Sequence, residues 1–278
     1  TLVKAGLIRW CPLFRFYVGT IGVGLMLQAG TYQLSPSMNI PAIAAKLARG
    51  DILKTTITIP EGFIIKDIES VLQKEFNRDI ALNFKARDFN NKFDLLNDVP
   101  VNFSLEGYLF PDTYNFPYTA EPEEITGEML SNFDKKLTPD LREEIRRQKK
   151  TIFEIVTMAS LIEKEVRTSG DKKIVSGILQ KRLEIDMPLQ VDATINYILS
   201  RPAARISIED TKIDSPYNTY KYRGLPFGPI ANPGIESILA AIYPAPSPYW
   251  YYLSTPEGQT IFSKNFEEHK AAQERYLK

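Results

Sequence analysis

The chain has almost none of the residues that build most catalytic and metal sites. Among its 278 residues, Cys11 is the only cysteine and His269 the only histidine, so no disulfide bond can form within the chain. A histidine-activated serine or cysteine nucleophile, and most zinc sites, would have to use His269. The CxxC, HExxH, GxGxxG and phosphate-binding loop motifs are absent as well. What remains is chemistry that carboxylates can carry out alone, and we expect no metal and no other cofactor.

The chain also lacks an excess of positive or negative residues, and it lacks long apolar runs. Lys plus Arg and Asp plus Glu number 34 each, which gives no electrostatic basis for binding nucleic acid or an acidic membrane surface. The most apolar early stretch, YVGTIGVGLMLQAG, is too short and too rich in glycine to span a membrane, and it is not a signal peptide. The sequence begins with Thr1, so an anchor or a signal upstream of it could be missing.

A weak internal repeat occupies the first part of the chain. TYQLSPSMNIPAIAAKL aligns with TITIPEGFIIKDIESVL at an offset of 25 residues, so that Ile40 matches Ile65. Each copy has the pattern of a short alternating strand, a turn and an amphipathic helix. Two copies are too few for a solenoid and predict a small α/β lobe. Two unrelated units with a chance spacing are the alternative.

The rest of the chain combines helical patterns with one long loop. An apolar helix is expected over residues 151–166, and a strand, a turn and a strand over YWYYLSTPEGQTIFS. Residues 214–234 hold no plausible helix, and a loop of that length in a compact domain is usually functional when it is not disordered. The predicted fold is α+β, with an N-terminal lobe over residues 1–115 and a larger mixed domain over residues 116–278.

Glu163 stands out within the apolar helix. At about 100° per residue, it falls in one narrow sector with Ile152, Val156 and Ala159, whereas Glu165 falls on the far side as a solvated or ion-paired acid. A lone buried carboxylate is costly, so Glu163 is expected to be either paired or kept protonated by its apolar surroundings. A protonated acid is what cleavage of a glycosidic bond needs. The alternative is a core glutamate tied to an arginine or to backbone amides.

The long loop offers partners for a sugar. Its tyrosines present flat apolar faces to sugar rings, and its asparagines present amides to sugar hydroxyls. Aromatics that simply order the loop are the alternative, and for Asp192 the alternative is a helix N-cap. The predicted substrate-binding residues, inside and outside this loop, are Glu106, Tyr108, Gln190, Asp192, Tyr217, Asn218, Tyr220 and Asn232.

Several motifs resemble those of one enzyme family in the same order along nearly the whole chain. They are LEGYLFPDTYNF, ASLIEKEV, LQVDATINY, SPYNTYKYRGLPFGPIANPG and FSKNFEEHKAA. In these the chain resembles the endolytic murein transglycosylases, the YceG-like lytic transglycosylases of bacteria. The resemblance implies a catalytic domain that cuts peptidoglycan glycan strands internally, with Glu163 in the matching SLIEKE motif as the catalytic glutamate. It also implies a LysM-like segment at about residues 54–105.

The resemblance carries further implications for location and mechanism. The family is held by a single-pass anchor with its catalytic part on the outer, periplasmic side of the cytoplasmic membrane, and cell wall synthases are candidate partners. The implied reaction is non-hydrolytic: one acid protonates the leaving oxygen, then takes the proton of the sugar's own 6-hydroxyl, which closes a 1,6-anhydro ring. Two alternatives stay open. One is a muramidase-type hydrolase with Glu106 or Asp192 as a second carboxylate, and the other is a non-catalytic peptidoglycan-binding module.

Overall fold

The structure, a computed structural model, describes residues 2–201 and 206–277 and has the predicted α+β fold. Its strands form two antiparallel pairs, β1 with β2 and β3 with β4. The strands are β1 (Lys54–Thr58), β2 (Thr113–Pro117), β3 (Tyr251–Ser254) and β4 (Thr260–Ser263). The α-helices are α1 (Cys11–Thr20), α2 (Ile40–Arg49), α3 (Ile65–Phe76), α4 (Pro122–Lys136), α5 (Pro139–Arg147), α6 (Ile152–Glu165), α7 (Ser169–Glu184), α8 (Asp192–Ile198), α9 (Ile235–Ile242) and α10 (Phe266–Tyr276). Short 3-10 helices are η1 (Gly24–Met26), η2 (Ala86–Asp88), η3 (Asp94–Leu96) and η4 (Asp210–Lys212).

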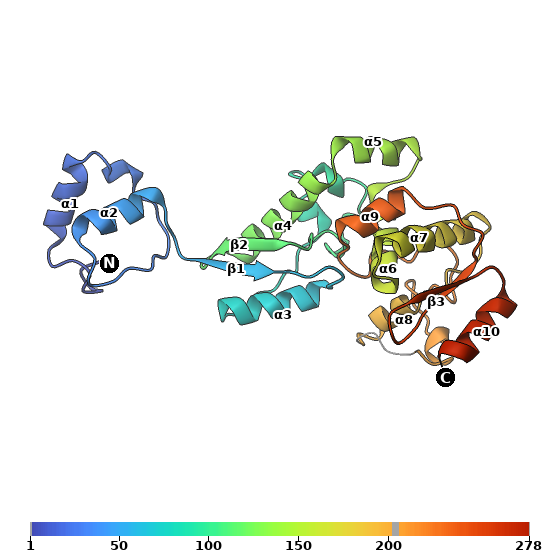
Figure 1. Cartoon of the computed structure of the whole chain (residues 1–278). Helices are drawn as coiled ribbons and strands as arrows, with labels where there is room; N and C mark the ends of the chain where they lie inside the picture. Colours follow the sequence, from blue (N-terminus) through green and yellow to red (C-terminus); the bar gives the residue numbers. More distant parts are fainter. Residues whose placement is uncertain (1, 202–205, 278) are drawn as a thin grey trace.

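The first 50 residues form a small body with a core of its own. Figure 1 shows α1 and α2 set apart from the other helices and joined to them through β1. The buried residues of this body are Ile8, Phe14, Val18, Ile43 and Ala44. Asn39 starts α2, because its side-chain oxygen accepts a hydrogen bond from the Ala42 N–H at 2.9 Å.

The repeat is confirmed in its helices and fails in one strand. α2 begins at Ile40 and α3 begins at Ile65, which is the predicted offset of 25 residues. The strand predicted for the second copy is β1. It forms because each of its residues pairs with a residue of β2. Residues 31–35 form no strand in the described chain. The Leu53 N–H, just before β1, donates to the Thr31 carbonyl at 2.7 Å. A single hydrogen bond between the two segments is too few for a strand ladder.

The boundary predicted near residue 115 falls inside β2. A division there would separate β2 from β1, although the two pair along their whole length. One continuous hydrophobic core extends from Ile57 to Ile242 and contains both strands and most of the helices after them. The cores therefore separate residues 2–50 from the remainder, and the segment predicted to be LysM-like shares its core with the C-terminal helices.

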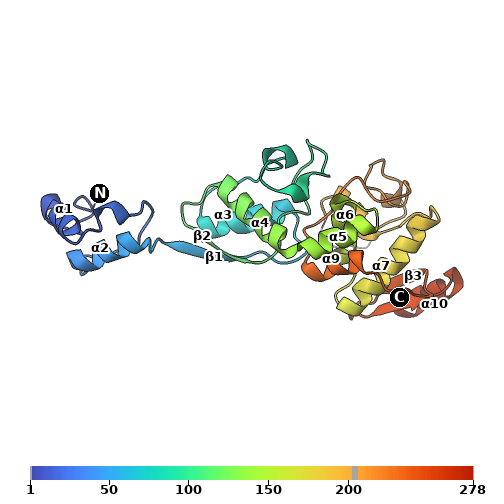
Figure 2. The same ribbon diagram turned by 90° about the horizontal axis from the view of Figure 1, so that it is seen from above.

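α6 is the central helix of the C-terminal part. It begins after Thr151, which forms a capping box with Glu154: the Glu154 N–H donates to Thr151 Oγ1 at 3.1 Å, and the Thr151 N–H donates to Glu154 Oε2 at 2.8 Å. Residues 155–162 are all buried. α7 and α9 pack against α6 and against each other, as the view from above shows (Figure 2). The predicted apolar helix is thus confirmed as the centre of this core.

The remaining predictions of secondary structure hold in the described residues. Residues 214–234 contain no helix. The YWYYLSTPEGQTIFS segment forms β3, a turn and β4. Within residues 2–201 and 206–277, no helix has the length and apolar character that a membrane crossing requires.

The turn at Gly107 gives a test of how the loop before β2 packs on α6. Gly107 has φ of 91°, and a Cβ atom there would lie 2.5 Å from Pro229 Cβ and 2.9 Å from Val156 Cγ1. Because both backbone strain and overpacking would result, Gly107→Ala should lower the free energy of unfolding by about 2–4 kcal/mol. Gly170→Ala is the matched control, since a Cβ there meets nothing within 4 Å. Urea unfolding that gave both variants the same stability would contradict this packing.

Candidate active site

The two glutamates near the end of α6 face different parts of the molecule. Residues two apart on an α-helix point in directions about 200° apart. Glu163 therefore faces α7 and α9, and its partners are Lys172 and Ser237. Glu165 faces the opposite way, toward Ala193 of α8 and Tyr252 of β3.

Glu163 is held in a buried ion pair. Lys172 Nζ lies 3.3 Å from each carboxylate oxygen of Glu163, and the side chains of Lys172 and Glu163 are only 3% and 8% exposed. The Gly234 N–H donates to Glu163 Oε2 at 3.0 Å, and Ser237 Oγ donates to the same oxygen at 2.7 Å. Gly234 is the N-cap residue of α9, so the carboxylate also lies at the positive end of that helix.

This environment differs from the apolar one predicted for Glu163. An ammonium group and two further donors suit a carboxylate and not a protonated acid. The helical wheel correctly puts Glu163 on an inward face but cannot show that α7 and α9 bring polar partners to it. Of the two outcomes expected for a buried glutamate, the structure shows the paired one. Through these bonds Glu163 connects α6 to α7 and to the start of α9.

A turn at Glu61 and Gly62, in the segment predicted to be LysM-like, docks beside this ion pair. The Gly62 N–H donates to the Asn232 carbonyl at 2.9 Å, and Lys164 Nζ donates to the Gly62 carbonyl at 3.2 Å. Glu61 lies close to the Glu163 carboxylate, and partial burial followed by that negative charge raises the pKa of Glu61. The turn therefore joins the N-terminal segment to the helix that carries both glutamates.

Glu165 has the environment of an acid that exchanges protons near neutral pH. Its side chain is half-buried and accepts hydrogen bonds from the Tyr252 hydroxyl and from the Ala193 N–H. Burial, and after it the negative charge of Asp192, raises the pKa of Glu165 to about 7. Arg182 opposes this shift only weakly. The prediction that Glu165 is a solvated or ion-paired acid is therefore wrong, because α8 and β3 cover it.

Asp192 and Tyr220 lie beside Glu165. The Tyr220 hydroxyl donates to Asp192 Oδ1, and the negative charges of Asp192 and Glu165 raise the pKa of Tyr220 further, after burial and the hydrogen bond. Asp192 does not act as an N-cap: α8 begins at Asp192 itself, Val191 is the N-cap residue, and no side chain caps this helix. The exposed carboxylate of Asp192 is thus available to a substrate that reaches Glu165.

The loop that carries Tyr220 is fixed to the segment before α8. The Gln190 N–H donates to the Thr219 carbonyl at 3.1 Å, and the Val191 N–H donates to Thr219 Oγ1 at 3.0 Å. Gln190 has φ of 52° and an exposed side chain. Arg182 Nη1 donates to the Leu189 carbonyl at 2.7 Å and so holds the same segment on α7. Gln190 therefore remains a candidate for substrate contact.

Both predicted asparagines are buried and bind the protein itself. The Asn218 side chain donates to the carbonyls of Thr211 and Ile213 and accepts from the Tyr220 N–H. The Asn232 side chain donates to the Phe63 carbonyl and to Glu106 Oε1, each at 2.9 Å, and accepts from the Leu109 N–H at 2.9 Å. With no exposed surface on either asparagine, these amides order loops and are not free to hold a sugar.

Tyr108 is likewise a core residue. It is fully buried and its ring packs on Phe133, with centroids 5.8 Å apart. A side chain without exposed surface cannot contact a glycan. The residues next to Tyr108, Glu106 and Gly107, do not indicate whether the tyrosine faces the solvent or the core. For this reason the sequence wrongly predicts an exposed Tyr108.

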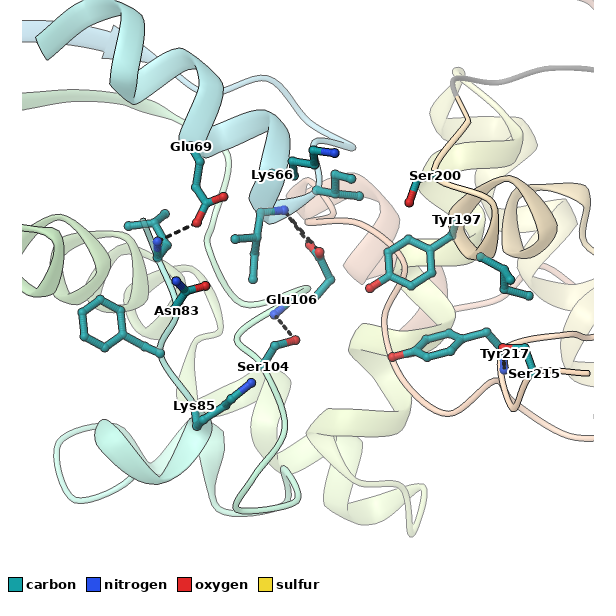
Figure 3. A pocket seen from close by; sticks show the side chains of 15 residues that line it. Lys66, Glu69, Asn83, Lys85, Ser104, Glu106, Tyr197, Ser200, Ser215 and Tyr217 are labelled. Carbon is teal, nitrogen blue, oxygen red and sulfur yellow. Dashed lines mark hydrogen bonds between the residues drawn. The ribbon is translucent and has the colours of Figure 1, made fainter. Parts of the chain in front are cut away.

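Glu106 and Tyr217 lie in a separate pocket, shown in Figure 3. Glu106 is buried and accepts hydrogen bonds from the Ile65 N–H at 3.2 Å and from the Asn232 amide. Burial raises the pKa of Glu106 to about 8. The Tyr217 ring packs on that of Tyr197, and their hydroxyls are hydrogen bonded to each other. These groups act on one another electrostatically, and none of them is among those that shift Glu165.

The sequence does not indicate that Lys172, Arg182 and Tyr252 lie around the two glutamates. Lys172 looks like one of several lysines on a polar helix, and Arg182 like another helix cation. Tyr252 belongs to a strand pattern that is fully explained by β3 and β4. No spacing along the chain links residues 165 and 252, so only the packed structure brings them together.

Comparison with known proteins agrees with this architecture. The YceG-like family matches residues 1–275. A protein of Bacillus subtilis strain 168 named endolytic murein transglycosylase is 34% identical in an alignment of 291 positions, which covers 99% of this chain and 80% of that protein. A protein of Streptococcus pneumoniae serotype 2 with the same name is 33% identical over 299 residues, and the match spans 97% of this chain but only about half, 54%, of that relative.

A solved structure matches over the same extent. The crystal structure of a yceG-like protein from Listeria monocytogenes superposes with a TM-score of 0.72 at 34% sequence identity, covering 98% of this chain and 93% of that one. Sequence and fold thus agree over nearly the whole chain, and the chain belongs to the YceG-like family.

Proposed function

We propose that this chain is an endolytic murein transglycosylase that cuts peptidoglycan glycan strands, with Glu165 as the acid and base. The observation that carries this proposal is the half-buried Glu165 carboxyl with a pKa of about 7, beside the exposed carboxylate of Asp192. The names of the relatives in Bacillus and Streptococcus supply the substrate class. The sequence alone favours Glu163 for this role, but its ion pair with Lys172 makes Glu163 the poorer proton donor.

Glu165 can serve both halves of a non-hydrolytic cleavage. In the first half, protonated Glu165 donates its proton to the oxygen that leaves as the bond between N-acetylmuramic acid and N-acetylglucosamine breaks. In the second half, its carboxylate takes the proton of the 6-hydroxyl as that oxygen attacks C1 and closes the 1,6-anhydro ring. A pKa of about 7 gives useful populations of both forms near neutral pH.

The neighbours of Glu165 have separate tasks in this mechanism. Tyr252 and the Ala193 N–H fix the orientation of the carboxyl group through their hydrogen bonds. The Asp192 carboxylate, oriented by Tyr220, can stabilise the positive charge that develops at C1. No second carboxylate is required to activate water, because the attacking hydroxyl belongs to the substrate.

Two alternatives follow from the same site. A muramidase-type hydrolase would use Asp192 as its second carboxylate, and the position of Asp192 next to Glu165 favours this candidate over one that uses Glu106. A non-catalytic peptidoglycan-binding module would not need the raised pKa of Glu165. From the murein substrate we also propose action on the outer side of the cytoplasmic membrane; a membrane anchor and cell wall synthase partners stay predictions of the family resemblance.

Glutamine variants of the two glutamates separate their roles. Glu165→Gln should lower cleavage of purified glycan strands at least about 100-fold, because general acid catalysis contributes that much or more, and should leave the fold stable. Glu163→Gln should lower the free energy of unfolding by about 3–5 kcal/mol, because it leaves Lys172 buried and unpaired. Its turnover per folded molecule, measured under conditions where it stays folded, should remain within several-fold of the parent. The reverse pattern would return the catalytic role to Glu163.

The pH dependence of stability tests the environment of Glu165. Because the folded protein raises the pKa of Glu165 from 4.5 to about 7, its contribution to stability is fully present below pH 4.5 and is lost as the pH rises to about 7. The difference in melting temperature between the parent and Glu165→Gln should therefore change through this window and be constant above it. Turnover should fall as the pH rises through about 7, since the first step needs the proton. Parallel melting curves would mean that Glu165 titrates as an ordinary glutamate.

The products distinguish the lytic route from the hydrolytic one. Mass spectrometry should find glycan ends that are lighter by one water than reducing ends, because the 1,6-anhydro ring forms without added water. Asp192→Asn should slow cleavage and leave this mass unchanged. Reducing ends in the parent reaction, lost together with activity in Asp192→Asn, would instead establish a hydrolase.

A further inference from the structure

The pocket around Glu106 lies apart from the proposed catalytic glutamate. It has a volume of about 660 Å³ and is open between the start of α3, residues 82–85, the end of α8 with Tyr197 and the loop that contains Tyr217. Figure 3 shows the two tyrosine hydroxyls directed at Glu106 from the C-terminal side. Neither Glu165 nor Asp192 lines it. Any ligand of this pocket would therefore bind without touching the reacting bond.

Two unpaired ammonium groups give the pocket its charge. Lys66 and Lys85 line it, and within residues 2–201 and 206–277 neither side chain forms an ion pair. The Glu69 carboxylate is engaged by the Leu82 N–H at 2.6 Å. Glu106 adds little negative charge at neutral pH, because burial raises its pKa to about 8. Two positive charges thus face one negative charge, and the pocket favours a ligand with carboxylates.

The walls of the pocket suit small apolar side chains. Ile64, Leu82 and Ile198 provide aliphatic surface, and the rings of Tyr197 and Tyr217, with centroids 5.1 Å apart, close one side. Hydroxyl groups at the tips of these rings can bind peptide amides. Carboxylates at one end and small aliphatic groups along the side are the features of a short acidic peptide rich in alanine.

We propose that this pocket binds the stem peptide of murein, the short acidic peptide carried on the muramic acid residues of the glycan. This rests on the proposed function for the identity of the peptide. N-acetylglucosamine is uncharged, and the lactyl carboxyl of a muramic acid that carries a peptide is used up in the amide bond to that peptide. Two free lysines would therefore add little to the binding of these sugars, whereas the stem peptide carries free carboxylates. Asp192 and Tyr197 are five residues apart on α8, about 7.5 Å along the helix axis. A peptide on a sugar near the cut is close enough to enter the pocket.

Titration of a synthetic stem pentapeptide into the intact chain tests this without requiring catalysis. Calorimetry should detect binding, and Lys66→Glu combined with Lys85→Glu should weaken it at least about tenfold through the lost charge pairing. Lys74→Glu is the matched control, because Lys74 is an exposed lysine of α3 outside the pocket and should bind as the parent does. The same peptide with its carboxylates amidated should bind as weakly as the double variant. No binding, or equal loss in Lys74→Glu, would overturn the proposal.

Cleavage assays then separate this site from the catalytic one. On glycan strands that carry peptides, the double lysine variant should raise KM at least about tenfold with kcat unchanged. On strands stripped of peptides, with the freed lactyl carboxyl groups converted to amides, it should match the parent. A similar rise in KM on stripped strands would show a glycan subsite and overturn the proposal. If the chain bound the pentapeptide through these lysines but cleaved neither substrate, the proposed function would fail and the peptide site would stand.

Discussion

The ion pair between Glu163 and Lys172 is the contact on which the C-terminal part of the molecule depends. Two charges that are almost completely removed from solvent are stable only if further donors complete their hydrogen bonding. The Gly234 N–H and the Ser237 hydroxyl supply them from the start of α9. One carboxylate thereby joins three helices, and the turn at Gly62 docks beside it. Breaking the pair would leave Lys172 buried without its partner and would lower the stability of the packing among α6, α7 and α9.

Two glutamates separated by a single residue therefore have opposite chemical characters. Glu163 points toward an ammonium group and a helix N-terminus, which favour the charged form. Glu165 points toward α8 and β3, where burial and the Asp192 carboxylate raise its pKa to about 7. Divergent environments for neighbouring carboxyl groups are the usual means by which a protein divides structural, acid and electrostatic roles among them. The different environments of Glu163 and Glu165 therefore say more about which of them donates a proton than the presence of either residue does.

The sequence predicts α2, α3 and α6, the second strand pair and the absence of a helix from residues 214–234, because these follow from local periodicity and turn residues. It also predicts that a carboxylate on α6 carries the chemistry. It does not predict which one, since the partners Lys172, Ser237 and Tyr252 come from distant segments that only packing brings to α6. For the same reason Asn218, Asn232 and Tyr108 look like surface contacts in the sequence but are buried. The predicted boundary near residue 115 lies inside β2, and the sequence does not show that β2 pairs with β1, whose residues are about 60 positions earlier.

The most direct test of the account is a titration of the individual glutamate side chains by NMR. With carbon-13 in the glutamate carboxyl groups, the resonance that disappears in Glu165→Gln can be assigned to Glu165 and followed between pH 3 and pH 10. The account predicts a midpoint near pH 7 for this resonance. A midpoint near 4.5, the ordinary value for a glutamate, would show that α8 and β3 do not shift the acid, and would contradict the assignment of Glu165 as the proton donor.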